Sequence, residues 1–149
     1  MKYIAFFITI LTFSNCDSAR QTQYNNPNAS FDTVVESDYG GKEEKSYTII
    51  KSKAELNKEL AALNLEEGAL NRLKSVDFSN QIVLSLHMGM RNSGGFGIQV
   101  SNVEINGKTT YVTIQETKPK PGENVTMALT NPFTIAVIDA NETIIFNEK

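Results

Sequence analysis

The chain has 149 residues, a formal net charge of −3 and an isoelectric point near 5.2. Its 14 basic and 17 acidic residues are mixed along the chain without a basic stripe, which argues against nucleic acid as the main partner. Cys16 is the single cysteine, so no intramolecular disulfide or multi-thiolate metal site can stabilise the fold. We therefore expect a packed core, which a domain of about 120 residues can supply.

The first 15 residues have the pattern of a secretory signal peptide. Lys2 is followed by the apolar run YIAFFITILTF at 3–13. As a helix this run is roughly 16 Å long, about half the hydrocarbon thickness of a membrane, so it cannot span one. Its length suits the apolar region of a secretory signal.

The segment Phe13-Ser14-Asn15-Cys16 resembles a bacterial lipobox, in which the chain is cut before the cysteine and the cysteine is acylated. The strict pattern has Leu at the place of Phe13 and Gly or Ala at the place of Asn15. The resemblance implies a bacterial envelope lipoprotein that carries palmitate-type chains and contacts the membrane only through them, with its domain outside the cytoplasm. It leaves the choice of membrane open. The alternative is a plain signal peptide that leaves Cys16 as a free thiol.

Residues 16–30 are expected to form a flexible tether after the lipidated cysteine. The stretch DSARQTQYNNPNAS at 17–30 is polar, lacks an apolar period and contains a proline. We therefore expect a single domain at 31–149.

A hairpin is predicted at the start of this domain, because the β-type runs 31–36 and 46–51 flank the turn signal DYGG at 38–41. One main helix is predicted at about 52–64. Ser52 is a suitable N-cap with Glu55 three residues later, and every third or fourth residue is apolar: Leu56, Leu60 and Leu63.

From residue 82 onward, alternating apolar and polar residues predict strands at 82–88, 96–105 and 109–117. Asn106-Gly107 predicts a type I′ hairpin between the last two. Regular pairing outward from that turn would place Ser101 opposite Val112, a polar residue opposite an apolar one. One extra residue at Ser101-Asn102 places apolar residues opposite each other again. A β-bulge is therefore predicted there, with Val100 opposite Val112 and Ile98 opposite Ile114.

The runs 133–138 and 143–146 flank another turn and predict a final hairpin. Taken together, these elements predict an α+β fold that is mainly antiparallel β. We expect a small β-sandwich or a curled sheet with one main helix.

No candidate active site is visible in the sequence. Loop 89–97 has two glycines spaced as in a phosphate-binding loop, but Gly95 stands where the lysine is required and a strand follows. Ser93 with His87 as its base lacks a nucleophile-elbow motif and an evident acid, and the alternation places His87 on the solvent side of its strand. With one histidine and no calcium-loop pattern, we expect no enzyme, no cofactor and no metal site.

Four blocks follow one another over nearly half of the chain: VDFS at 76–79, GMRNSGGFGI at 89–98, ETKPKPG at 116–122 and VTMALTNPF at 125–133. In this order they resemble the C-terminal domain of the PrcB family, named for a subunit of a bacterial surface protease complex. Asn92-Ser93 replaces a Pro-Thr-like pair, and Glu123-Asn124 lies where many members carry a cysteine. The resemblance implies an accessory, non-catalytic role in an envelope assembly, with a surface or secreted peptidase as the expected protein partner.

The strand order places loops 89–95 and 118–124 at one end of the sheet, where we expect them to bind protein. The alternative is that their glycines and prolines only satisfy turn geometry. The candidate residues of the two loops are Arg91, Ser93, Gly94, Gly95, Phe96, Lys118, Pro119, Lys120 and Pro121.

A second hypothesis is a peptidase inhibitor similar to chagasin, which presents three loops at one end of a β-sandwich. SGGF at 93–96 and NPF at 131–133 are similar to two of these loops, which adds Pro132 and Phe133 to the candidate binding residues. A full strand at 125–129 would carry Pro132 to the far end, whereas a short crossover would keep it beside the other loops.

Overall fold

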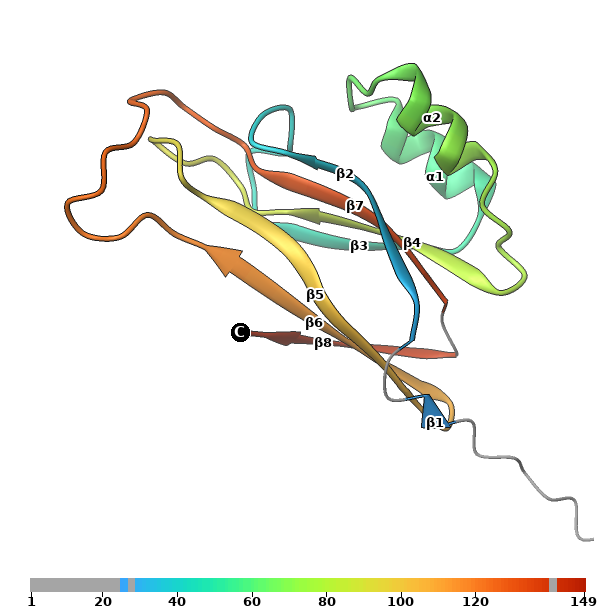
Figure 1. Ribbon diagram of the computed structural model, residues 1–149. Coiled ribbons are helices and arrows are strands. Elements are labelled where there is room, and N and C mark those ends of the chain that lie inside the picture. The colour runs from blue at the N-terminus through green and yellow to red at the C-terminus, as the bar shows by residue number, and fades with distance from the viewer. Residues whose placement is uncertain (1–24, 27–28, 140–141) are drawn as a thin grey trace, which may run out of the picture.

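The structure is a computed structural model that describes residues 25–26, 29–139 and 142–149 (Figure 1). The predicted signal peptide, Cys16 and most of the predicted tether lie outside these residues. Of the tether residues that are described, Asn25–Asn26 form strand β1, which pairs with the end of β5. Ala29 is buried and its N–H donates to the Val103 carbonyl at 2.9 Å, so the fold includes residues that precede Phe31.

The described chain forms eight strands and two helices arranged in three layers (Figure 1). One sheet has the order β1-β5-β6-β8, the other has the order β2-β7-β4-β3, and helices α1 and α2 cover the outer face of the second. The remaining bounds are β2 Phe31–Ser37, β3 Ser46–Ile50, α1 Lys53–Leu60, α2 Glu67–Lys74, β4 Gln81–His87, β5 Gly97–Asn106, β6 Thr109–Thr117, β7 Phe133–Asp139 and β8 Thr143–Glu148. The predicted α+β fold, mainly antiparallel β, is thus confirmed as a two-sheet sandwich, with α2 as a second helix beside the predicted main helix. No helix in the described part of the chain is long and apolar enough to cross a membrane.

Strands β4 and β7 lie in the middle layer and bury side chains on both faces. Leu84 and Leu86 pack against the other sheet, whereas Val83 packs toward the helices. The prediction that His87 faces solvent was wrong, because the polar side of β4 lies under the helix layer and His87 is fully buried. Alternation identifies the two faces of a strand but not what covers each face.

Both predicted hairpins outside the Asn106-Gly107 turn were wrong. β2 pairs with β7 and β3 pairs with β4, so the two strands that flank DYGG lie at opposite edges of one sheet. β7 and β8 belong to different sheets, and β8 pairs with β6 in parallel. In each case the turn changes the direction of the chain, but a segment distant in sequence offers the better apolar partner.

The predicted β-bulge is confirmed, since the β5–β6 register shifts between Val100 and Asn102. The pairing around it differs by two residues, with Val103 opposite Val112 and Val100 opposite Ile114. The cause is the turn. Asn106 pairs with Thr109, and Gly107 alone has a positive φ, +59°, as in a type II′ turn with glycine at its first central position rather than a type I′ turn.

Helix α1 begins as predicted but ends earlier, at Leu60 rather than near residue 64. The Ser52 hydroxyl accepts the Glu55 N–H at 3.2 Å, and the Glu55 carboxylate accepts the Lys51 N–H at 2.8 Å. Leu56 is buried beneath the helix. The cap and the apolar stripe therefore fix α1 against the sheet and place its last turn above β4.

Candidate functional site

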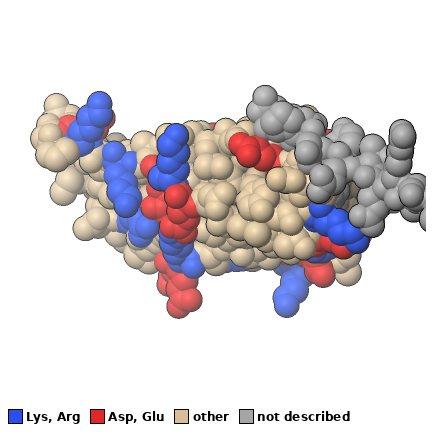
Figure 2. All heavy atoms as spheres, turned by 90° about the horizontal axis from the view of Figure 1, so that it is seen from below, with Lys and Arg blue, Asp and Glu red and all other residues tan. Residues whose placement is uncertain are grey.

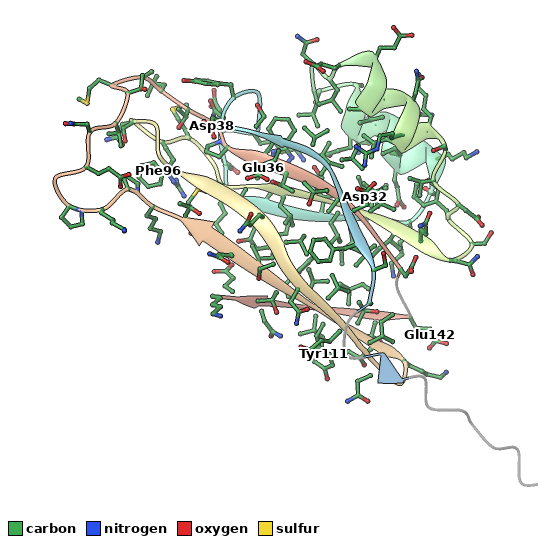
Figure 3. The ribbon with its side chains drawn as sticks, viewed as in Figure 1. Asp32, Glu36, Asp38, Phe96, Tyr111 and Glu142 are labelled. Carbon is green, nitrogen blue, oxygen red and sulfur yellow. The ribbon has the colours of Figure 1, made fainter. Side chains whose placement is uncertain are left out.

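Three loops meet at one end of the sandwich, which we call the loop end. They are residues 38–45 between β2 and β3, residues 88–96 between β4 and β5, and residues 118–132 between β6 and β7 (Figure 1). Asp38 and Phe96 lie at this end and Glu142 lies toward the opposite one (Figure 3). The arrangement follows from the strand order, because antiparallel neighbours place alternate connections at the same end.

Loops 88–96 and 118–132 form one unit through backbone hydrogen bonds. Arg91 and Thr130 exchange N–H to carbonyl bonds of 2.8 and 2.9 Å, as in a short antiparallel bridge. The Gly94 N–H donates to the Thr126 carbonyl at 2.8 Å, and the Thr130 hydroxyl donates to the Ser93 carbonyl at 2.9 Å. These bonds fix the predicted loop 89–95 to residues 126–130, which directly follow the predicted loop 118–124 in the chain.

Loop 38–45 joins the same unit. The Gly41 N–H donates to the Asn131 carbonyl at 3.0 Å, and the Asn131 N–H donates to the Asp38 carbonyl at 2.9 Å. The Met90 N–H donates to the Glu43 carbonyl at 2.8 Å. Sequence reasoning left this third loop out, because the predicted 31–36/46–51 hairpin carried no functional signal.

Gly95 combines a positive φ of +82° with a close approach of the neighbouring loop. A Cβ at this position would lie 3.0 Å from Val125 Cγ1 and 3.2 Å from Pro119 Cβ. A side chain would therefore be strained in its backbone and crowded by the proline loop. At this residue the turn-geometry explanation of the glycine is correct, and Pro119 acts with it as a packing pair.

The loop end exposes a group of large apolar side chains. Of the five large apolar residues that are exposed in the described part of the chain, four lie in its three loops: Tyr39 at 55%, Met90 at 41%, Met127 at 88% and Leu129 at 63%. Met90 and Leu129 are the chain neighbours of the bridged pair Arg91 and Thr130. Clustered exposed apolar residues mark interaction surfaces on soluble domains. Sequence reasoning missed all four, because an apolar residue in a predicted loop usually belongs to the core.

The candidate cation Arg91 lies over the Phe96 ring, with the guanidinium carbon 5.7 Å from the ring centre. Its Nη1 donates to the Met90 carbonyl at 3.0 Å, which holds the side chain across the loop. Lys118 and Lys120 are exposed on the neighbouring loop. The loop end thus combines apolar side chains with a positioned arginine and two exposed lysines.

The candidates Pro132 and Phe133 are buried beneath this surface. The Pro132 carbonyl accepts the Met88 N–H at 2.9 Å. Phe133 is 3% exposed and its ring stacks on His87, with centres 5.6 Å apart. Neither side chain is placed to contact a partner, so their role is to support the loops from below.

A buried polar cluster lies under the loop end, where β4 meets the last turn of α1. His87 Nε2 lies 2.9 Å from the Ser85 hydroxyl and 3.1 Å from Glu59 Oε1. The Ser85 hydroxyl donates to Glu59 Oε1 at 2.8 Å, and Lys42 Nζ pairs with the same carboxylate at 2.7 Å. Sequence reasoning found no acid beside His87, because Glu59 is one of several glutamates on a helix with nothing to mark it.

This Ser-His-Glu group does not have the geometry of a nucleophilic triad. His87 Nδ1 accepts the Lys42 N–H at 3.1 Å, so the neutral ring carries its proton on Nε2 and has no free lone pair for the Ser85 proton. Burial lowers the pKa of His87, although the hydrogen bond to Glu59 opposes this. Ser93, the other serine considered, donates to its neighbour's carbonyl at 3.2 Å.

Burial alone would raise the pKa of Glu59, but hydrogen bonds from Lys42, Ser85 and His87 outweigh it and hold that pKa below its ordinary value. The carboxylate is therefore charged and fully used as an acceptor. Within residues 25–26, 29–139 and 142–149, no three His, Cys, Asp or Glu side chains are grouped as metal ligands. The cluster connects α1, β4 and loop 38–45, and its chemistry is that of a structural hydrogen-bond network.

Comparison with protein families identifies part of the chain. The family model described as PrcB C-terminal matches residues 82–139, which run from β4 through β7. This confirms the predicted resemblance over that stretch, and the matched residues include two of the three loops of the loop end. No curated protein and no solved structure matches the chain.

Proposed function

Because residues 82–139 match the PrcB C-terminal family, we propose that this chain is a non-catalytic protein-binding domain that serves a surface protease complex. The loop end is its binding surface. The observation that carries the proposal is the group Tyr39, Met90, Met127 and Leu129, exposed on three loops that backbone hydrogen bonds fix together. A rigid sandwich with apolar loop tips can bind a partner at low entropic cost.

The chemistry of the exposed residues supports a protein partner. Methionine adapts its shape to irregular apolar surfaces, and tyrosine, methionine and arginine are enriched at the centres of protein interfaces. Met127 and Leu129 lie on the part of loop 118–132 that forms no strand. Neither side chain packs in the core, so both are available to contact a partner.

We further propose that Cys16 carries the lipid and that the loop end points away from the membrane. Strand β1 pairs with Asn106 at the turn that joins β5 to β6, whereas β5 begins at the loop end (Figure 1). β5 has ten residues, so the two ends are about 30 Å apart. A tether that enters through β1 would leave the loop end facing outward, toward a partner in the envelope space.

The inhibitor hypothesis receives mixed support. Residues 125–129 form a crossover rather than a strand, which keeps Pro132 at the loop end. Burial of Phe133, however, removes the aromatic side chain that the third inhibitor loop would need at the surface. We therefore rank it below the accessory-subunit proposal. Titration of the full chain against papain-like and subtilisin-like peptidases tests it, and the absence of inhibition at micromolar concentration would remove it.

The main proposal is tested by site-specific photo-crosslinking in the native envelope. A photoreactive amino acid replaces Met127 in one variant and Ile145 in the matched control, which is an exposed apolar residue in β8. We expect an adduct that contains a peptidase-complex subunit from position 127 and none from position 145. Equal adducts from both positions, or none from position 127, would contradict the proposed surface.

A further inference from the structure

Within this proposed function, we infer that the partner docks an apolar segment that carries a carboxylate, and that Arg91 binds this carboxylate on a loop end that also exposes Met90 and Leu129. The inference rests on the loop end being the binding surface. It adds the chemistry of the partner and names the residue that selects it.

The position of Arg91 is fixed, while its charge has no counter-ion among the residues that the structure describes. The side chain is half-buried, lies over Phe96 and donates to the Met90 carbonyl. No carboxylate of the described residues lies within ion-pair distance of its guanidinium. A guanidinium held in one place offers its remaining N–H groups in a planar fork that matches a carboxylate.

Three lysines near this end, Lys42, Lys45 and Lys118, already have acidic partners. Lys45 pairs with Glu116 at 2.8 Å and with Glu148 at 3.1 Å. Seen from below, acidic and basic side chains gather in a band toward the loop end, next to a broad uncharged area (Figure 2). Arg91, by contrast, pairs with no carboxylate of the described residues, and its side chain is held over the Phe96 ring by a hydrogen bond to the Met90 carbonyl.

The flanking residues favour a protein segment over other anionic ligands. Met90 precedes Arg91 directly, and Leu129 precedes Thr130, whose backbone is bridged to Arg91. A ligand that reaches the guanidinium therefore meets two loops that also expose apolar side chains, which a peptide with hydrophobic residues beside an Asp or Glu would match. A membrane surface could offer the same two chemistries, but the proposed tether enters the fold at the opposite end.

The partner chemistry can be tested without knowing the partner, by using a random-sequence peptide library displayed on phage as the probe. The purified full chain is selected against the library as wild type, Arg91→Glu, the double variant Met127→Ser with Leu129→Ser, and the control Lys53→Glu. Lys53 is an exposed cation at the start of α1, and none of the ion pairs of the described residues includes it. Melting temperatures within a few degrees of the wild type establish that each variant is folded.

We expect the wild type and Lys53→Glu to enrich peptides with hydrophobic residues next to Asp or Glu. Arg91→Glu should weaken the binding of these peptides about 10–100-fold, or shift the enrichment to peptides that contain Lys or Arg. If the double variant loses peptide binding but the wild-type peptides show no preference for Asp or Glu, the role of Arg91 is wrong and the loop end is still the binding surface. If no enriched peptide depends on either set of residues, both proposals fail. Binding to phosphatidylglycerol vesicles that Arg91→Glu abolishes, with the peptide pattern unchanged, would identify a lipid ligand and overturn the inference.

Discussion

The backbone N–H of Lys42 donates to Nδ1 of His87 across 3.1 Å, and so ties loop 38–45 to the central strand β4. The side chain of Lys42 completes the connection by pairing with Glu59 at 2.7 Å, so one residue links the loop to both the sheet and α1. Loop 38–45 in turn accepts the Met90 N–H through the Glu43 carbonyl. The buried cluster thus supports the exposed surface directly above it.

Replacing His87 should destabilise the fold strongly. His87→Ala removes the acceptor of the Lys42 N–H and a partner of Glu59, and leaves a hole under Phe133. We expect a loss of about 2–4 kcal/mol in the free energy of unfolding. Urea denaturation measures it, with Asn124→Ala in the exposed loop as the control. A loss for His87→Ala no larger than that of the control would show that the cluster contributes nothing.

Acidification should reduce stability in two stages. The folded pKa of His87 lies below its ordinary value of 6.5, so the unfolded chain binds more protons as the pH falls below 6.5. Stability is therefore full above pH 6.5 and falls until the folded pKa is passed. Glu59 has a folded pKa below its ordinary 4.5, so a second loss begins below pH 4.5.

Urea midpoints between pH 4 and 8 measure this dependence for the wild type and for His87→Gln. A single titrating proton changes the unfolding free energy by at most about 1.4 kcal/mol per pH unit. The stage between pH 6.5 and the folded pKa should be missing from His87→Gln. Identical profiles for the two proteins would mean that His87 is not the titrating group.

The close approach at Gly95 can be separated from its backbone conformation. Gly95→Ala and Gly122→Ala both place a Cβ on a residue with a φ of +82°, but only the Cβ at Gly95 meets a neighbour within 4 Å. We expect the strained backbone to reduce the free energy of unfolding of each variant by about 1–2 kcal/mol. Gly95→Ala should lose about 1 kcal/mol more, because its Cβ crowds Pro119 and Val125. Thermal melting of the two variants measures the difference. Equal losses would show that the proline loop moves aside freely.

The lipid anchor can be tested by metabolic labelling of a bacterial host with a palmitate analogue. The wild-type chain should take up the label and fractionate with membranes. Cys16→Ser should lose both properties, because acylation needs the thiol and the apolar run is too short to hold the chain alone. A wild type without label would favour the plain signal peptide, and label that persists in Cys16→Ser would show that Cys16 is not the acylated residue.

The part of the fold that depends on neighbouring residues could be predicted from the sequence. The Ser52 cap and the bulge next to Asn102 follow from spacings within a few residues, and both are present. The partners of β2 and β8 could not be predicted, because each depends on which distant strand covers an apolar face most completely. The same limit applies to His87, whose polar neighbours suggested solvent until α1 was placed above it.

For the candidate site, the strand order was enough to predict that loops 89–95 and 118–124 lie at the same end of the sheet. It could not identify the exposed side chains. Met127 and Leu129 have the composition of core residues, and only a packed structure shows that no layer covers them. Loop 38–45 was missed because β2 and β3 were predicted to form a hairpin, whereas each pairs with a strand distant in the sequence.

The pairing of β2 with β7 joins the first long strand of the fold to one of its last, with Phe31 opposite Ile138. Almost the whole domain must therefore be synthesised before the middle layer can close, and folds dominated by such long-range contacts form slowly. The signal peptide proposed from the sequence would export the chain unfolded, and slow closure of the middle layer would suit that export by keeping the chain open until it has crossed the membrane.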